Sequence, residues 1–185
     1  EMQRSLVGSE MCIRDRQFSS AKTLDGKVYT ITLCGQTVPF GTDLLFCCSG
    51  MQDYTFGVEL CEDLWVPCPP CERLTASGAN IICNPSASDE VIGKEGYRRL
   101  LVSSTSARLA CGYVYSNAAP SESTQDMVFS NHHIIAENGT LLAENRPFEE
   151  NGLIVSEIDV ARLTHERHRI TTYDVVPGGY EVIFP

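Results

Sequence analysis

The chain has 185 residues, of which 43% are hydrophobic and 21% charged, and this composition excludes a coiled coil and a disordered chain. The formal net charge of −10 disfavours nucleic acid as a partner, and no apolar run approaches the roughly 20 residues of a membrane span. The nine cysteines are an odd number, which favours a reduced cytoplasmic protein over a secreted disulfide scaffold.

The N-terminal segment is left out of the fold prediction. Ser5–Arg16 has neither helical nor strand periodicity, and it resembles the translation of a sequencing adapter. Residues 1–16 are therefore predicted to be an adapter scar, with a disordered tail as the alternative, and they show no secretory signal. Cys12 would then belong to the scar and not to the natural sequence. The natural sequence is expected to begin upstream of Gln17.

Strand-like and helix-like segments alternate along the rest of the chain. Runs of β-branched and aromatic residues predict strands, the i, i+3, i+4 apolar pattern predicts helices, and Asn138-Gly139 predicts a hairpin turn. Strands are expected at Lys27–Leu33, Leu44–Cys48, Thr55–Leu60, Ala79–Cys83, Cys111–Tyr115, Asp126–Phe129, His132–Ala136, Leu141–Glu144 and Gly152–Ile158. Helices are expected at Glu72–Ser77, Lys94–Ala110 and Val160–Arg169.

Two finer expectations concern the longest helix and the C-terminal tail. Helical spacing puts four apolar residues of the helix on one inward stripe, namely Tyr97, Leu100, Leu101 and Ala107. The tail, residues 171–185, contains a Pro-Gly-Gly sequence and is expected to be a linker. The order of strands and helices predicts α/β layers around a mixed sheet.

The most informative segment is residues 57–67, GVELCEDLWVP. An apolar strand delivers Cys61 to its carboxyl end, where α/β sheets place their ligands. A nucleophilic thiolate needs a sharp turn there, so that its sulfur projects and the next backbone N–H groups face a developing oxyanion. Taken alone, however, these residues favour a simpler interpretation, a buried cysteine followed by the solvated acidic pair Glu62 and Asp63.

Several segments together resemble one family. They are PFGTDLLF from Pro39, GVELCEDLW from Gly57, NPSAS from Asn84, the helical sequence from Tyr97, and ESTQDMVFSNHHIIAENGTLLAENRPF from Glu122. Over roughly residues 17–180, the chain resembles the nitrilase-type glutaminase domain of the glutamine-dependent NAD synthetases. The CEDLW and ESTQD sequences are typical of this branch, whereas generic nitrilases share only the cysteine elbow and the general layout.

This resemblance implies a fold and a set of site residues. The fold would be an αββα sandwich, incomplete because its N-terminal strands and helices are missing, with residues 17–170 as the partial carbon–nitrogen hydrolase domain. Cys61 would be the nucleophile that forms a γ-glutamyl thioester and releases ammonia, and the N–H of Glu62 would form half of the oxyanion hole. Glu62, Trp65 and Ser88 would line the glutamine pocket.

The resemblance also implies partners outside this domain. Residues 171–185 would begin the linker to an absent synthetase domain that uses ATP, Mg²⁺ and deamido-NAD in NAD biosynthesis, whereas this domain would need no metal or cofactor. Glutamine, the chain's own synthetase domain and further copies of the protein would be its partners.

The chain departs from the family in its catalytic triad. The family uses a Glu–Lys–Cys triad whose Glu and Lys precede the cysteine in separate segments, and neither segment is present here. Lys22 and Lys27, the only lysines before Cys61, lack the expected context. We therefore expect a truncated domain that is inactive as a glutaminase on its own.

Other interpretations remain open at this stage. Cys68-Pro69-Pro70-Cys71 is a CxxC sequence and allows a redox pair or, with Cys61 and Cys83, a zinc site, although the spacing matches no compact zinc knuckle. A non-catalytic nitrilase-like module and a free-standing amidase are the further alternatives. His132 and His133 are expected on opposite faces of a strand, and Arg98-Arg99 is expected to form surface or interhelix pairs.

Overall fold

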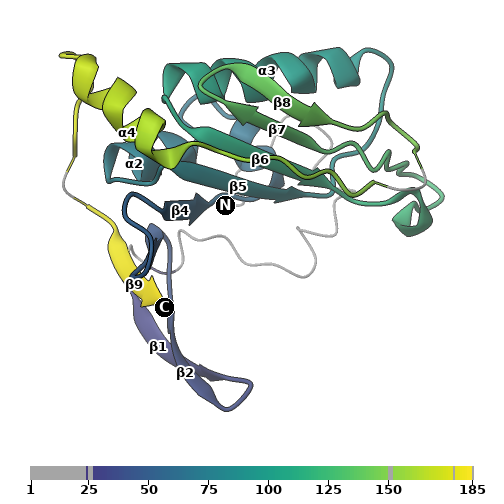
Figure 1. Ribbon diagram of the computed structural model, residues 1–185. Coiled ribbons are helices and arrows are strands. Elements are labelled where there is room, and N and C mark those ends of the chain that lie inside the picture. Colours follow the sequence, from purple (N-terminus) through teal and green to yellow (C-terminus); the bar gives the residue numbers. More distant parts are fainter. Residues whose placement is uncertain (1–23, 25–26, 150–151, 177, 185) are drawn as a thin grey trace.

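The computed structural model describes residues 24, 27–149, 152–176 and 178–184. Seven strands form one mixed sheet in the order β8-β7-β6-β5-β4-β3-β9, and β1 and β2 form a separate hairpin (Figure 1). The strands are β1 (Tyr29–Leu33), β2 (Gln36–Phe40), β3 (Leu44–Cys48), β4 (Thr55–Val58), β5 (Ile81–Ser86), β6 (Gly112–Asn117), β7 (Ile134–Glu137), β8 (Thr140–Glu144) and β9 (Tyr180–Phe184). The helices are η3 (Cys61–Trp65), α2 (Pro70–Ala76), α3 (Lys94–Arg108), η4 (Pro120–Glu122) and α4 (Val160–Arg169).

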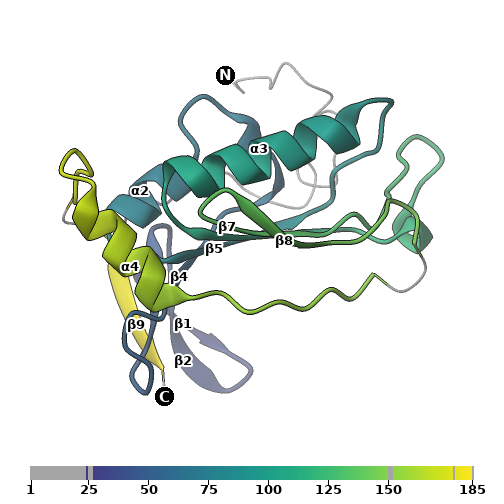
Figure 2. The ribbon, with the colours of Figure 1, turned by 45° about the horizontal axis from the view of Figure 1, so that its top comes forward.

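The centre of the sheet is built from parallel strands. β4, β5 and β6 pair in parallel, with α2 connecting the first two and α3 connecting the last two. Both helices cover the same face of the sheet (Figures 1 and 2). The carboxyl ends of these three strands therefore meet at one edge, which is where parallel α/β sheets place their functional residues.

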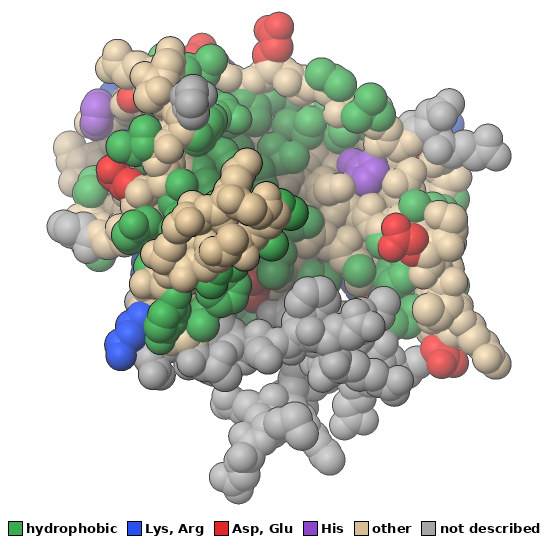
Figure 3. Space-filling model, turned by 90° about the horizontal axis from the view of Figure 1, so that it is seen from below, with side chains coloured by type: hydrophobic (Ala, Val, Ile, Leu, Met, Phe, Trp, Pro, Cys, Tyr) green, Lys and Arg blue, Asp and Glu red, His purple; other side chains and the backbone are tan. Residues whose placement is uncertain are grey.

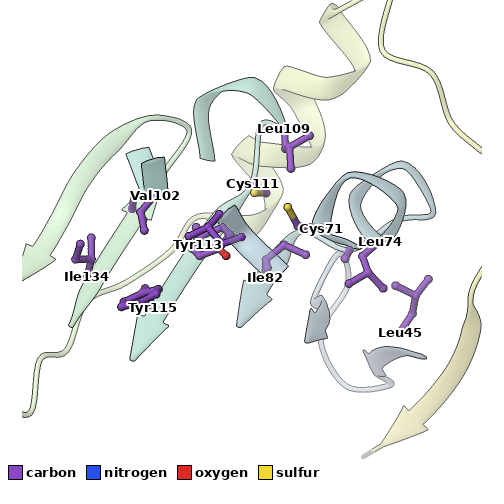
Figure 4. Packing of buried hydrophobic residues seen from close by; sticks show 13 residues of the cluster. Leu45, Cys71, Leu74, Ile82, Val102, Leu109, Cys111, Tyr113, Tyr115 and Ile134 are labelled. Carbon is purple, nitrogen blue, oxygen red and sulfur yellow. The ribbon is translucent and has the colours of Figure 1, made fainter. Parts of the chain in front are cut away.

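The core lies between the sheet and helices α2 and α3. Leu45, Gly57, Ile82, Tyr113 and Ala136 are register partners across five neighbouring strands. Figure 4 shows several of these side chains packing together with Leu74 of α2 and Val102 of α3. A Cβ on Gly57 would lie 3.0 Å from a Leu74 methyl carbon, so glycine allows α2 to approach β4 closely.

The opposite face of the sheet is also rich in apolar side chains. Figure 3 shows hydrophobic side chains gathered on this side of the molecule. Phe46 of β3 and Phe56 of β4 stack with ring centroids 4.8 Å apart, and Phe184 of β9 meets Phe56 edge to face. Such aromatic pairs add about 0.5–1.5 kcal/mol beyond their buried area.

The structure confirms the α/β layers with a mixed sheet and most of the expected elements. Leu44–Cys48 and Val160–Arg169 have the predicted bounds, and the other confirmed elements differ at their ends. Asn138 and Gly139 have φ values of 44° and 85°, which is the backbone twist of a two-residue hairpin turn.

The strand predictions differ from the structure at four places. Asp126–Phe129 and Gly152–Ile158 contain no strand, although Phe129 forms an isolated bridge with Asp89. Conversely, β2 was not expected, because a Cys-Gly turn is an unusual hairpin signal. The strand β9 lies in the tail that was expected to be irregular, where it pairs in parallel with β3 and joins the main sheet.

The expected inward stripe of α3 is also wrong. Tyr97 and Leu100 are 53% and 64% exposed, and the buried positions of this helix are Arg98, Val102, Thr105 and Ser106. Arg98 can lie on the buried face because Glu90 and His132 accept its hydrogen bonds there. Hydrophobic periodicity expects only apolar side chains on such a face. Within the described part of the chain, none of the helices has both the length and the apolar character needed to cross a bilayer.

Candidate active site

Cys61 lies at a sharp turn directly after β4. It is the first residue of η3 and has a φ of 50°, in the left-handed region that costs a non-glycine residue about 1–3 kcal/mol. Two hydrogen bonds close the turn: the Leu60 N–H donates to the Asp63 carboxylate at 2.8 Å, and the Asp63 N–H donates to the Leu60 carbonyl at 2.9 Å. Cys61 is half-buried, as the elbow predicted from the sequence requires.

Asn84 on the neighbouring strand holds the backbone of Cys61. The Cys61 N–H donates to Asn84 Oδ1 at 2.9 Å, and Asn84 Nδ2 donates to the Cys61 carbonyl at 3.4 Å. The Ser86 hydroxyl donates to the same Asn84 oxygen at 2.6 Å. Asn84 is buried at the carboxyl end of β5, so its amide gives the turn a fixed partner.

Behind Asn84 lies a buried pair, Glu59 and Tyr113. The Tyr113 hydroxyl donates to Glu59 Oε1, and Asn84 Nδ2 donates to the Tyr113 oxygen at 3.0 Å. The N–H of Cys71, in the first turn of α2, donates to Glu59 Oε2 at 2.8 Å. Burial raises the pKa of Glu59 and, together with the adjacent carboxylate, the pKa of Tyr113. Sequence reasoning assigned neither residue to the site.

Trp65, the last residue of η3, lies against the start of α3. Its ring contacts that of Tyr97 at 5.3 Å between centroids, and Lys94 Nζ lies 5.4 Å from the Trp65 ring centroid. Lys94 Nζ also pairs with the Asp89 carboxylate at 2.6 Å. A cation therefore lies beside Trp65, and its position at the start of a predicted helix is the one sign of it in the sequence.

Ser88 lies just beyond the carboxyl end of β5. Its N–H donates to Asn117 Oδ1 at 2.8 Å, and Asn117 Nδ2 donates back to the Ser88 carbonyl at 3.1 Å. Asn117 ends β6, so these hydrogen bonds hold Ser88 at the same sheet edge as Asn84. Glu62 follows Cys61 in η3 and is half-buried. The structure thus places Cys61, Glu62, Trp65 and Ser88 at or next to the carboxyl ends of β4 and β5.

A buried charge network lies between α3 and the strands on that side. Arg98 is fully buried; Nη1 donates to Glu90 Oε2 at 3.0 Å and to His132 Nδ1 at 2.8 Å. Because arginine is only a donor, Nδ1 of His132 accepts and its Nε2 carries the proton that is donated to Glu144 at 2.7 Å. Burial lowers the pKa of His132, which agrees with a neutral ring. The expectation that Arg98 forms surface or interhelix pairs is therefore wrong. The strand predicted from His132 begins two residues later, at Ile134, so His132 lies just before β7.

The structure gives no support to a redox or zinc site at the CxxC sequence. Cys68 is exposed, whereas Cys71 is fully buried, and burial and the neighbouring Glu59 raise the pKa of its thiol. In the described ranges, no three His, Cys, Asp or Glu side chains gather as metal ligands would.

Known proteins resemble this chain in sequence and in fold. No family model matches the chain. The glutamine-dependent NAD(+) synthetase of Mycobacterium tuberculosis is 42% identical over 151 residues, which are 81% of this chain and 22% of that protein. A crystal structure of the Cytophaga hutchinsonii enzyme of the same name has a TM-score of 0.59 and 29% identity, and covers 74% of this chain and 20% of its own. A Saccharomyces cerevisiae nitrilase-superfamily protein has a TM-score of 0.54 at 22% identity, covering 79% of this chain and 46% of its own.

These matches first define the class: the chain has the α/β fold of the nitrilase superfamily. Within that class, its sequence relatives are glutamine-dependent NAD synthetases, so the resemblance inferred from the CEDLW, NPSAS and ESTQD segments is confirmed. The chain spans about a fifth of the length of these relatives, 22% in the Mycobacterium tuberculosis protein.

Proposed function

We propose that this chain is the glutamine-hydrolysing part of a glutamine-dependent NAD synthetase, with Cys61 as its nucleophile. The observation that supports this best is the elbow: a half-buried cysteine in left-handed backbone at the carboxyl end of a parallel strand, held there by Asn84. The similarity to NAD synthetases over 81% of the chain supports the same reaction class.

In the proposed reaction, Cys61 Sγ attacks the side-chain amide carbon of glutamine. The new S–C bond replaces the C–N bond, and ammonia leaves with the proton that the thiol has given up. Water then cleaves the γ-glutamyl thioester, giving glutamate and the free thiol. The Glu62 N–H follows the nucleophile directly, so it is suited to stabilise the oxyanion of the tetrahedral intermediate. We propose that the general base and a lysine come from a segment upstream of Gln17.

The remaining site residues fit the ends of an amino acid. The Glu62 carboxylate suits the substrate α-ammonium, and the Ser88 hydroxyl can hydrogen-bond the same end of the molecule. Trp65 would form an apolar wall, and the Lys94 ammonium beside it suits the α-carboxylate. This domain would use no cofactor. Its ammonia would pass to the chain's own synthetase domain, where ATP, Mg²⁺ and deamido-NAD bind, in a cytoplasmic oligomer.

The selectivity for glutamine tests this proposal. The measurement uses the extended protein, which is this chain lengthened at both ends to the length of its relatives. Butyramide has the reacting amide of glutamine without the α-ammonium and α-carboxylate, so it loses two charged hydrogen bonds of about 1.5–3 kcal/mol each, and we expect its kcat/KM to be lower by ~100-fold or more. Glu62→Gln should lower kcat/KM for glutamine by about 10–100-fold, because a charged hydrogen bond contributes about 1.5–3 kcal/mol.

The same variant should leave butyramide hydrolysis within about threefold, because butyramide lacks the ammonium group that the charged hydrogen bond serves. The matched control is Glu157→Gln, which changes an exposed carboxylate outside the site. Equal rates with glutamine and butyramide would instead identify a free-standing amidase and contradict the proposal.

A further inference from the structure

We propose that Glu59, Tyr113 and Asn84 form a positioning relay, a chain of hydrogen bonds whose direction fixes the Asn84 amide and thereby the backbone of Cys61. The inference rests on the proposed function, since it concerns the nucleophile. The proposal does not require any of the three residues to touch the substrate. They act through the backbone of Cys61 and are therefore positioning residues.

The direction of the relay is set at Glu59. Its two carboxylate oxygens accept from different donors, Oε2 from the Cys71 N–H at 2.8 Å and Oε1 from the Tyr113 hydroxyl. The backbone N–H can only donate, and the hydroxyl has one proton to give. When Glu59 is ionised, both of its oxygens are acceptors, and the Tyr113 hydroxyl donates its only proton to Glu59.

The next step fixes Asn84. Because the Tyr113 hydroxyl donates its hydrogen bond to Glu59, its oxygen presents a lone pair to Asn84. Nδ2 of the Asn84 amide donates to that oxygen at 3.0 Å. The amide oxygen must then face the opposite way, where it accepts from the Cys61 N–H at 2.9 Å and from Ser86 at 2.6 Å. A flipped amide would set its NH₂ group against the Cys61 N–H, two donors facing each other.

Burial makes this orientation matter energetically. The relative exposures of Glu59, Tyr113 and Asn84 are 2%, 0% and 1%, so bulk water cannot replace a partner that is lost. An unsatisfied buried polar group costs about 1–3 kcal/mol, which is comparable to the cost of the left-handed backbone at Cys61. Breaking one hydrogen bond of the relay is therefore expected to cost about as much as the left-handed backbone at Cys61.

The isosteric change Glu59→Gln breaks the relay in either orientation of the new amide. If the glutamine oxygen accepts from Tyr113, its NH₂ group faces the Cys71 N–H. If it instead accepts from Cys71, its NH₂ group donates to Tyr113, whose proton loses its acceptor at Glu59 and is either left unsatisfied or turned to Asn84, whose amide must then flip. Both orientations leave a buried donor without an acceptor.

The test uses the extended protein and compares Glu59→Gln with Glu137→Gln. Glu137 is a similarly buried carboxylate at 5% exposure, at the far end of β7, where it accepts from the Asp159 N–H and from Arg162. We expect Glu59→Gln to speed hydrogen exchange at the Cys61 amide by ~10–100-fold and to lower kcat for glutamine by a similar factor, with KM within about threefold. Glu137→Gln should change neither.

Tyr113→Phe supplies a second variant and a double-mutant cycle. If Glu59 acts on Cys61 only through Tyr113, adding Glu59→Gln to Tyr113→Phe should change Cys61 exchange by less than about twofold, because the two effects share one path. Full additivity of the two changes would overturn the relay, as would a Glu59→Gln variant whose Cys61 exchange equals that of Glu137→Gln. If Cys61→Ala keeps full glutaminase activity, the proposed function fails instead, whatever the exchange shows.

Discussion

Replacing Cys61 with alanine in the extended protein is expected to lower ammonia release from glutamine by at least about 10⁴-fold. The substitution removes the atom that forms the thioester, and the groups of a catalytic triad act as a unit, so the remaining groups cannot compensate. Glutamine binding should survive, because Glu62, Trp65 and Ser88 remain. The measurement is steady-state ammonia production together with glutamine binding by calorimetry.

Cys68→Ala is the matched control for this experiment. Cys68 lies in the loop between η3 and α2, seven residues after Cys61, and its side chain is exposed. Its replacement should keep at least about half of the activity, since exposed substitutions change stability by only about 0.5 kcal/mol. Loss of turnover in Cys68→Ala with retention in Cys61→Ala would move the chemistry to the CxxC sequence.

Replacing Arg98 with leucine is expected to destabilise α3 against opening by about 3–5 kcal/mol. The change leaves Glu90 without its buried cation and removes the donor to His132 Nδ1, and breaking a buried ion pair from one side has a cost of this size. The free energy of opening can be measured by hydrogen exchange of the α3 amides, which does not require the whole protein to unfold in one step.

Arg99→Leu is the neighbouring control on the same helix. Arg99 pairs with Glu95 and Glu144, but its side chain is 40% exposed, and exposed ion pairs contribute about 0–1 kcal/mol. We expect the opening free energy of α3 to fall by no more than about 1 kcal/mol in this variant. Equal effects of the two substitutions would show that the Arg98 network adds nothing specific to the stability of the helix.

Local sequence predicted the parts of the fold that depend on local patterns. The apolar run Leu44–Cys48 and the helix Val160–Arg169 have the expected bounds, and Asn138-Gly139 forms the expected hairpin. The strand Tyr180–Phe184 has a strand-like composition, but the Pro-Gly-Gly before it outweighed that signal. Its place in the sheet depends on pairing with β3, more than 130 residues earlier, which no local pattern reports.

The candidate site also combines a part that depends on local sequence with a part that depends on contacts between distant residues. The strand that ends at Cys61 is visible in the local sequence, but that pattern alone favours a buried cysteine, and the family resemblance is what implied a nucleophile at this turn. The groups that support the turn come from distant positions: Asn84 is 23 residues from Cys61, and Tyr113 is 54 residues from Glu59. Hydrophobic periodicity also assigns buried positions to apolar residues, so it missed Arg98, whose burial is possible only because Glu90 and His132 meet it there.

Covalent labelling by a diazoketone analogue of glutamine tests the assignment of the nucleophile most directly. The extended protein would be incubated with the analogue, with and without excess glutamine, and the modified peptide identified by mass spectrometry. We predict one adduct per chain, located on Cys61, with a rate that glutamine suppresses, because labelling requires an accessible thiolate in the glutamine pocket. An adduct that forms first on Cys68 or Cys83, with Cys61 unmodified, would contradict the assignment.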